Sequence, residues 1–343
     1  MKRVALAAGL SFAAALPAQA ALDPDVNLSG TFGYSLSWFK NNSVGNEFTD
    51  VDTENNGSNF RITAAAQDLG IRAFVAYERG ASNDQTGVED VREFFGGVSG
   101  KMGTLIYGRK ATDYRLAGER LDPFYNTSVA FGYNAVGNGG FASEGASYGL
   151  SNLTNGYTSN TVALRSPVWL GFTLNGAAYI NENRSNVGVG DEADYAAGVG
   201  YANSHWLGLD VGVQALDLNG NVVSNAPGQS NAYRVHASVG EKLWAVGVSL
   251  ELVDVQSETD PRQYGFVSAS YQVLEDLRLA LAVGTIADSP SFDGTGGTFG
   301  VFYEMTKNLG TYAALRYVTL DNGTENKTTT FATGVKFVFD VDL

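Results

Sequence analysis

The residues of this chain best suited to chemistry are basic side chains that recur at alternate positions within apolar segments. Five of them fall on the polar side of that alternation: Arg61, Arg72, Arg92, Lys110 and Arg165. Fixed charges of this kind attract, orient or repel polar solutes when they line a confined aqueous space. Catalysis needs a nucleophile, an acid–base pair or a metal as well, and the sequence offers few candidates for those roles.

The groups that usually catalyse reactions or bind metals are scarce. The chain has no cysteine and two histidines, His205 and His236, neither with a clear ligand partner in the sequence. We therefore expect no metal, no cofactor and no enzymatic activity. No Gly-x-Ser-x-Gly motif stands at a strand-to-helix turn, so a hydrolase that uses a serine and one of the two histidines is a minor alternative.

Acidic candidates concentrate in one long connection, residues 111–159. Asp113, Glu119 and Asp122 lie there, close in sequence to two arginines. The same stretch contains aromatic and aliphatic residues that seek burial, and structureless loops of this length are uncommon unless they are functional. If the rest of the chain forms a barrel, we expect this loop to fold back into the wide lumen of that barrel and narrow it. The alternative is a flap that caps the mouth from outside.

Composition and charge limit the class of protein. The 343 residues include 42 glycines, and the hydrophobic fraction of 44% makes extensive disorder improbable. The formal charge of -14 argues against a nucleic-acid partner, which would require a basic surface. A chain of this length fits two ordinary domains or a single large all-β barrel.

The first twenty residues have the features of an export signal. Lys2 and Arg3 precede a short apolar run, and an Ala-x-Ala site ends at Ala20. This pattern predicts a signal peptide over residues 1–20 that is cleaved on export, and one barrel domain over residues 21–343. No later apolar run is long enough for a membrane-spanning helix.

The rest of the chain alternates with a period of two residues. From Val26 to Trp38, one parity is apolar and ends in aromatic residues, whereas the other is small and polar. Seven short turns alternate with eight long polar stretches, one of which is residues 40–57. Such a pattern predicts a 16-stranded antiparallel transmembrane β-barrel, all-β in class, with short turns on one side and long loops on the other. A soluble β-sandwich is the alternative, but aromatic residues at strand ends favour a membrane.

Three segments carry a resemblance to a known family. They are Phe94 to Arg109, the sequence Leu121-Asp122-Pro123-Phe124, and the stretch from Asn160 through Gly171-Phe172. In order and spacing they resemble the constriction-loop region of the general trimeric porins of Gram-negative outer membranes. The resemblance implies an outer-membrane homotrimer, in contact with lipid and lipopolysaccharide, with one water-filled pore per subunit. Small hydrophilic solutes and ions would diffuse through each pore passively.

The resemblance also implies roles for the charged residues. Arg61, Arg72 and Arg92 match the basic side of the pore constriction, and Asp113, Glu119 and Asp122 are candidates for its acidic side. The alternative is that these charges form salt bridges that hold the loop. Arg109 has the opposite parity to the pore-lining residues, so we expect it to face outward, at a subunit contact with an acid from a neighbour.

Several points stay open in the sequence. Asp50, Asp52 and Glu54 faintly resemble a calcium loop, but solvated surface acids are the simpler interpretation. Barrels of this family usually end in an aromatic residue, so either Leu343 substitutes for it or the last strand ends at Phe339. Two rival functions also remain, a channel selective for anions or sugars and a structural or adhesive barrel.

Overall fold

The fold is taken from a computed structural model of the chain. It describes residues 24–43, 46–81, 91–131, 149–151, 153, 157–180, 193–203, 207–219, 229–289, 293–321, 323 and 325–343. The predicted signal peptide and His205 lie outside these residues, as does the side chain of Glu54. Among the described residues, no helix is long and apolar enough to cross a membrane.

The described chain consists of strands and one short helix. The strands in the first half are β1 (Asp25–Ser43), β2 (Asn46–Asn55), β3 (Asn59–Asp68), β4 (Ile71–Gly80), β5 (Val91–Gly100), β6 (Gly103–Ala111), β7 (Tyr157–Arg165), β8 (Phe172–Tyr179) and β9 (Asp194–Asn203). Those in the second half are β10 (Leu209–Leu218), β11 (Ser230–Glu241), β12 (Trp244–Val255), β13 (Arg262–Leu274), β14 (Leu277–Ala287), β15 (Asp293–Thr306), β16 (Leu309–Asp321) and β17 (Glu325–Asp342). The helix α2 (Asp113–Glu119) follows β6 directly.

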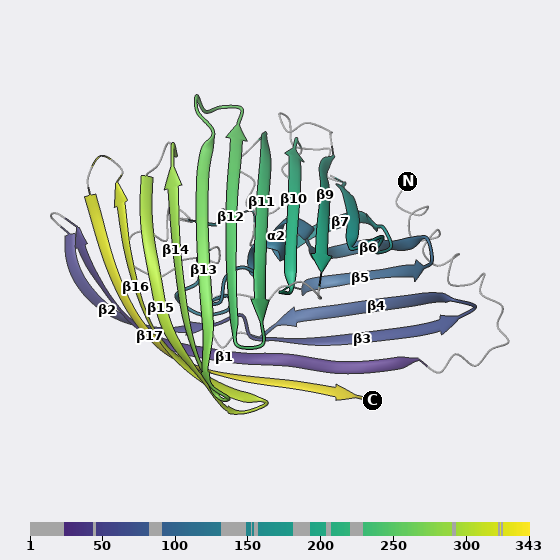
Figure 1. Ribbon diagram of the computed structural model, residues 1–343, viewed down its shortest axis with the longest axis horizontal. Helices are drawn as coiled ribbons and strands as arrows, with labels where there is room; N and C mark the ends of the chain where they lie inside the picture. The colour runs from purple at the N-terminus through teal and green to yellow at the C-terminus, as the bar shows by residue number, and fades with distance from the viewer. Residues whose placement is uncertain are drawn as a thin grey trace.

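The strands form one antiparallel sheet that closes on itself (Figure 1). Each strand from β3 onward pairs with its successor, and β17 pairs with β1 from Asn27↔Asp342 to Asn41↔Thr328. β2 and β3 pair with successive halves of β1, separated by a break at residues 56–58, so the two segments occupy one position in the barrel. The seventeen segments therefore make sixteen barrel strands, and the predicted all-β barrel is confirmed.

One predicted loop is a hairpin instead. Residues 40–57 include the end of β1 and all of β2, which pair from Tyr34↔Asn55 to Ser43↔Asn46. The prediction of a long loop here was wrong because these residues are polar on both faces, and a strand without an apolar face shows no alternation in the sequence.

The alternation of residue type along each strand, with a period of two, gives the barrel wall an apolar outer face and an inner face whose residues are buried. In β12, Val246, Val248, Leu250 and Leu252 are exposed on the outside, whereas Ser249 and Glu251 between them are buried. An exposed apolar band around a closed barrel is the surface that contacts membrane lipid. The inner face is buried because another part of the chain covers it.

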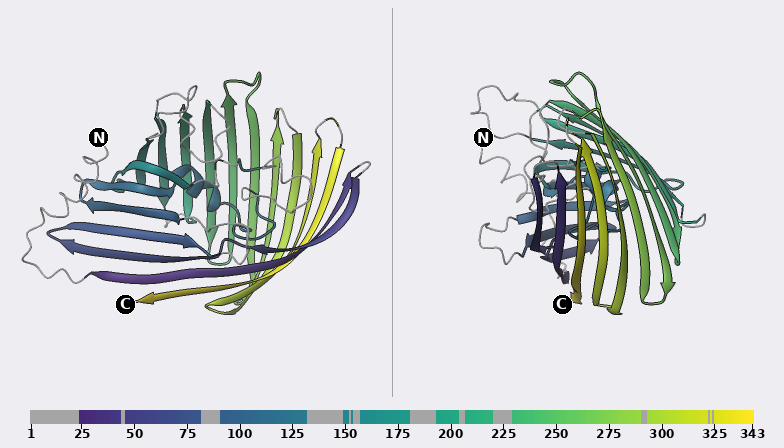
Figure 2. Two further views of the ribbon diagram at one scale, coloured as in Figure 1. Left: turned by 180° about the vertical axis from the view of Figure 1, so that it is seen from behind. Right: turned by 90° about the vertical axis from the view of Figure 1, so that its left-hand side faces the viewer.

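That covering is supplied by residues 111–131, 149–151 and 153. Figures 1 and 2 show the sheet curving around α2. Phe131 packs edge-on against Phe266 of β13 with ring centroids 5.0 Å apart, and Phe124 packs against Phe302 of β15 at 5.7 Å. Ser268 also donates a hydrogen bond of 2.5 Å to the Leu121 carbonyl. Because these wall residues face inward, the loop lies inside the barrel.

The last strand runs almost to the end of the chain. β17 extends through Asp342, and the Leu343 N–H donates to the Val26 carbonyl at 2.9 Å. The alternative in which the strand ends at Phe339 was therefore wrong. Leu343 closes the register between the first and last strands.

Candidate functional site

The helix α2 begins because its first turn is capped. The hydroxyl of Thr112 accepts a hydrogen bond of 3.0 Å from the Arg115 N–H, and Asp113 adds a negative charge at the positive end of the helix. At its other end, the Arg120 guanidinium reaches Asp210 of β10 at 3.5 Å. The helix is thus held along the inner wall, with one side turned toward β3, β4 and β5.

On that side, Arg115 organises a polar cluster. Its guanidinium bonds the Glu119 carboxylate one helical turn later and the hydroxyls of Tyr125 and Tyr157, the latter at 3.1 Å. It also lies over the Tyr157 ring, 4.0 Å from the centroid. A planar guanidinium held from several directions keeps a fixed orientation, so the loop presents Arg115 and Glu119 as a rigid pair.

The opposing wall carries charges of both signs. Arg61 of β3 forms ion pairs with Glu78 of β4 at 3.1 Å and with Glu93 of β5 at 2.6 Å. The Glu93 carboxylate also accepts the Ala111 N–H at 3.0 Å, just before the loop begins. Both carboxylates that pair with Arg61 therefore belong to the wall itself.

Arg92 reaches the same place through a β-bulge. The pairing of β4 with β5 runs Glu78↔Glu93 and then Arg79↔Val91, so Arg92 is the extra residue. Its guanidinium donates to the Gly57 carbonyl at 2.8 Å and lies 4.0 Å from Glu78. Alternation in the sequence predicts that Arg92 faces inward, but it does not predict Glu93 as a site residue. The bulge turns both side chains inward, and neither residue type indicates a bulge in the sequence.

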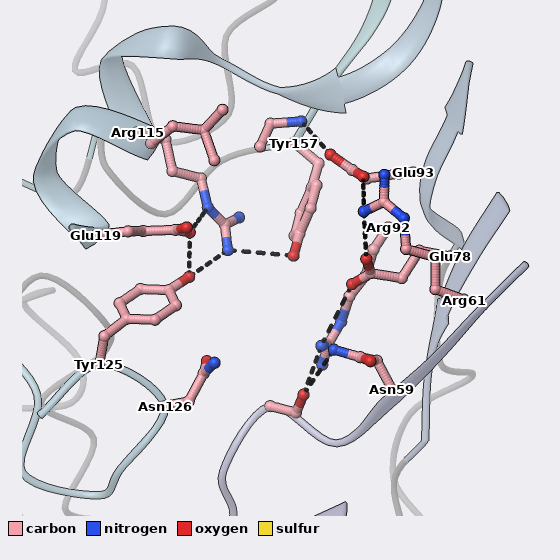
Figure 3. Close-up of a pocket in the computed structure, with 13 residues that line it drawn as sticks. Asn59, Arg61, Glu78, Arg92, Glu93, Arg115, Glu119, Tyr125, Asn126 and Tyr157 are labelled. Carbon is pink, nitrogen blue, oxygen red and sulfur yellow. Dashed lines mark hydrogen bonds and ion pairs between the residues drawn. The ribbon is translucent and has the colours of Figure 1, made fainter. Parts of the chain in front are cut away.

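These residues enclose a cavity of about 210 Å³ between the loop and the wall. Figure 3 shows Arg115, Glu119 and Tyr125 on one side, and Arg61, Glu78 and Arg92 on the other. The lining has three arginines and three glutamates, which balance formally, together with tyrosine and asparagine side chains. Such a surface offers donors and acceptors to a hydrated solute without a large net charge.

Two other predicted basic residues meet the loop at the start of α2. Asp113 lies 3.4 Å from Lys110 of β6 and 4.0 Å from Arg165 of β7, and it accepts a hydrogen bond of 2.7 Å from Asn175. Burial raises the pKa of Asp113, but Lys110, Asn175 and Arg165 outweigh burial and hold it below its usual value. Asp113 is therefore a carboxylate that fastens the helix to the wall.

Asp122 lies within the loop, away from the cavity lining. Its two carboxyl oxygens accept the N–H groups of Phe124 and Phe131 at 2.9 and 2.8 Å, and the side chain is buried. Burial raises the pKa of Asp122 to about 6, although the two backbone hydrogen bonds and Arg316 act in the opposite direction. This carboxyl closes the turn that seats Phe124 and Phe131 against the barrel wall.

The remaining candidates lie elsewhere. Arg72 is exposed near the turn between β3 and β4, outside the cavity. Arg109 has the parity of Leu105 and Tyr107, which are exposed on the outer surface. Its guanidinium donates to the Val91 carbonyl at 2.8 Å and to the Ser159 hydroxyl at 2.9 Å. It therefore has two hydrogen-bond partners within its own chain.

Comparison with known proteins gives a consistent result. A family profile described as Gram-negative porin matches residues 4–323. A comparison with curated protein sequences finds no match. Among solved structures, the chain is similar to the anion-selective porin from Comamonas acidovorans, with a TM-score of 0.72, 15% identity and coverage of 92% of this chain and 100% of that chain.

Two further structures have the same architecture. Salmonella typhi OmpF, in a complex with daunomycin, gives a TM-score of 0.64 at 15% identity, with 92% of this chain and 97% of that chain covered. A trimer form of OmpT from Vibrio cholerae gives 0.64 at 13% identity, with 92% and 99% covered. At these identities the likeness concerns the fold.

Proposed function

The chain belongs to the Gram-negative porin family, and on that premise we propose that solutes cross it between α2 and the wall formed by β3, β4 and β5. It is an outer-membrane channel for passive diffusion of small hydrophilic solutes. The loop narrows the lumen at the cavity lined by Arg61, Arg92 and Arg115. The observation that supports this passage is that the cavity lies between an inward loop and a charged wall.

The charges of this constriction discriminate only weakly between ions of opposite sign. Glu78 and Glu93 neutralise Arg61 and Arg92 within the wall, while Glu119 neutralises Arg115 on the loop. Solutes that carry both donors and acceptors gain hydrogen bonds there, whereas apolar solutes must displace bound water without replacing its hydrogen bonds. This supports general diffusion over a site for one preferred anion or sugar.

Ion selectivity in planar bilayers tests the constriction. Purified Glu78→Gln, Glu93→Gln protein should shift toward anions, and Arg61→Ala, Arg92→Ala protein should shift toward cations, because each pair of changes removes charge of one sign. Lys101→Gln, in an exposed turn, is the control. If the arginine double variant retains the selectivity of the unaltered protein, the passage does not run between these residues.

Liposome swelling with sugars of graded size separates the rival functions. A general pore should show rates that fall smoothly with solute size and do not saturate. Saturable uptake would favour a selective channel, and absence of uptake would favour a structural or adhesive barrel. The family and its structural relatives are channels, and we propose no catalytic role for this chain.

We further propose that residues 1–20 are a signal peptide that is cleaved on export. We also propose that the chain assembles as a homotrimer in contact with outer-membrane lipid and lipopolysaccharide. The trimer form of the Vibrio cholerae structure supports the assembly. The chemistry of residues 1–3 and of the site at Ala20 supports the cleavage. N-terminal sequencing of protein from the outer membrane and native mass spectrometry test the two statements.

A further inference from the structure

Three large apolar side chains face the lumen from the adjacent strands β4, β5 and β6 (Figure 1), on the short-turn side of the cavity. They are Phe74, Phe95 and Ile106. Successive side chains on a strand point to opposite faces. Their neighbours Val75, Phe94 and Leu105 are exposed on the outer surface, so the three lie on the inner face. We call these three side chains the lumen patch.

The lumen patch is not part of the core beneath the inward loop. Phe266, on the wall that the loop covers, is buried, whereas Phe74, Phe95 and Ile106 are each partly exposed. In the described part of the chain, none of the three belongs to the buried cluster that contains Phe131. Packing under the loop therefore does not account for them, and the lumen patch is an apolar surface that water in the lumen reaches.

Glycine opposite the patch fixes the position of one ring. Gly97 stands across from Phe74 on one side and from Ile106 on the other, and an added Cβ would lie 2.6 Å from the Phe74 ring. The Phe74 ring thus lies over Gly97, and the Phe95 ring meets it edge-on at 81°, with centroids 6.4 Å apart. The Arg61 guanidinium lies 5.8 Å from the centre of the Phe95 ring, so the patch begins directly beside the constriction.

A polar edge borders the patch toward the short turns. Arg72 shares its face of β4 with Phe74 and stands opposite Ser99 of β5, whose hydroxyl accepts a hydrogen bond of 3.0 Å from the Thr104 hydroxyl. Two residues of a strand span about 7 Å. A small solute that lies along β4 therefore reaches an aromatic ring at one end and a guanidinium at the other.

Arg72 is available to such a solute. It is exposed, and within the residues that the structure describes it forms no ion pair within 4.0 Å. Asp25 of β1 stands opposite Ala65 on the same part of the wall, but β3 lies between it and Arg72. A guanidinium binds a planar carboxylate through two parallel hydrogen bonds.

We propose that the lumen patch and Arg72 form a shallow site for small aromatic carboxylates, which occupy it briefly as they diffuse through the channel. The ring of the solute lies against the two phenylalanines, and its carboxylate meets Arg72. An aromatic ring is favoured over an aliphatic ring of similar size because aromatic pairs attract beyond the area that they bury. The occupant is a small solute because the patch lies inside the barrel. The inference rests on the proposed function, since a solute reaches the patch only through the lumen.

Block of the potassium chloride current in planar bilayers by three carboxylates tests the site. Benzoate, cyclohexanecarboxylate and acetate carry the same charge, and the first two are similar in size. Benzoate should reduce the current of the unaltered protein at a concentration about two- to tenfold lower than cyclohexanecarboxylate does. Equal block by these two would overturn the aromatic site. Absence of conductance from the unaltered protein would instead contradict the channel itself.

A matched pair of double variants locates the rings responsible. Phe74→Leu, Phe95→Leu protein keeps apolar side chains on the lumen wall but removes both rings, so it should lose the preference for benzoate. Phe94→Leu, Phe172→Leu protein removes two rings from the outer surface and should retain that preference. A preference that persists in the lumen variant would overturn the proposal.

Arg72→Gln tests the carboxylate end separately, at an exposed position near a turn. Benzoate should block the unaltered protein at lower concentration than neutral benzamide, because only benzoate pairs with the guanidinium. In Arg72→Gln protein this advantage should fall by about two- to fivefold, while block by benzamide stays the same. An unaltered ratio of benzoate to benzamide block would overturn the role of Arg72.

Discussion

Arg234 and Glu251 stand directly opposite one another on β11 and β12 and form an ion pair of 2.7 Å in which both side chains are completely buried. Both limbs of the inward loop bind this pair. The Tyr114 carbonyl accepts from Arg234 at 2.6 Å, and the Tyr114 hydroxyl donates to Glu251 at 2.7 Å. On the returning limb, the Ser151 N–H donates to Glu251 at 3.1 Å. The pair therefore fastens the loop to the wall opposite the passage.

Removing one member of this pair should destabilise the protein strongly. Glu251→Ala leaves the Arg234 guanidinium buried without a counter-charge, and we expect a loss of about 3–5 kcal/mol in the free energy of unfolding. The two loop limbs lose an acceptor as well, so open-channel current noise should rise. Glu258→Ala is the control, because its partner Arg262 is partly exposed and such pairs contribute about 0–1 kcal/mol. Equal losses from both variants would show that the buried pair has no special role.

Asp122 should make the docked loop more stable at acid pH. An undocked aspartate titrates near pH 3.9, whereas burial raises the pKa of Asp122 to about 6. A raised folded-state pKa means that docking favours the protonated form. The contribution of Asp122 to the stability of the docked loop is therefore complete below about pH 4, and it falls by about 3 kcal/mol as the pH rises through 6. Thermal unfolding of the unaltered protein and of Asp122→Asn from pH 4 to 7 measures this. The amide of Asp122→Asn stays neutral like the protonated carboxyl, so the two proteins should have similar stability near pH 4. The unaltered protein should become the less stable of the two as the pH rises, and a constant difference would contradict the assignment.

The sequence predicts the barrel well because the membrane imposes the pattern on every strand. An outward residue must tolerate lipid and an inward one must tolerate water or the loop, so alternation and turn positions are visible in the residues themselves. The hairpin of β1 and β2 was missed because Asp50 and Asp52 belong to a strand without an apolar face. Glu93 was missed because a bulge at Arg92 breaks the period of two. The burial of Asp122 depends on contacts with distant strands, and a local pattern does not encode them.

Gly57 should be difficult to replace. It sits in the break between β2 and β3 with φ of +71°, and an added Cβ would lie 2.7 Å from the Asn126 side-chain oxygen. Gly57→Ala therefore combines backbone strain with a clash against the loop, and we expect a loss of about 1–3 kcal/mol. The Gly57 carbonyl would also shift away from Arg92, so selectivity should change with stability. Gly70→Ala shares the positive φ but meets nothing within 4 Å, and should leave selectivity unaltered. Similar selectivity in both variants would show that Gly57 does not position Arg92.

A charge on the outer apolar band should report the depth of each residue in the membrane. Leu250 is 64% exposed near the middle of β12, between inward residues that are buried, so its side chain contacts the lipid core. Leu250→Arg should reduce the free energy of unfolding in bilayers by about 2–4 kcal/mol, since lipid does not solvate a guanidinium. Met102 is 96% exposed in the turn between β5 and β6, where water reaches it, and Met102→Arg should cost about 0–1 kcal/mol. Denaturant titrations of both variants in lipid vesicles measure the two values. Equal losses would mean that Leu250 does not face the hydrocarbon.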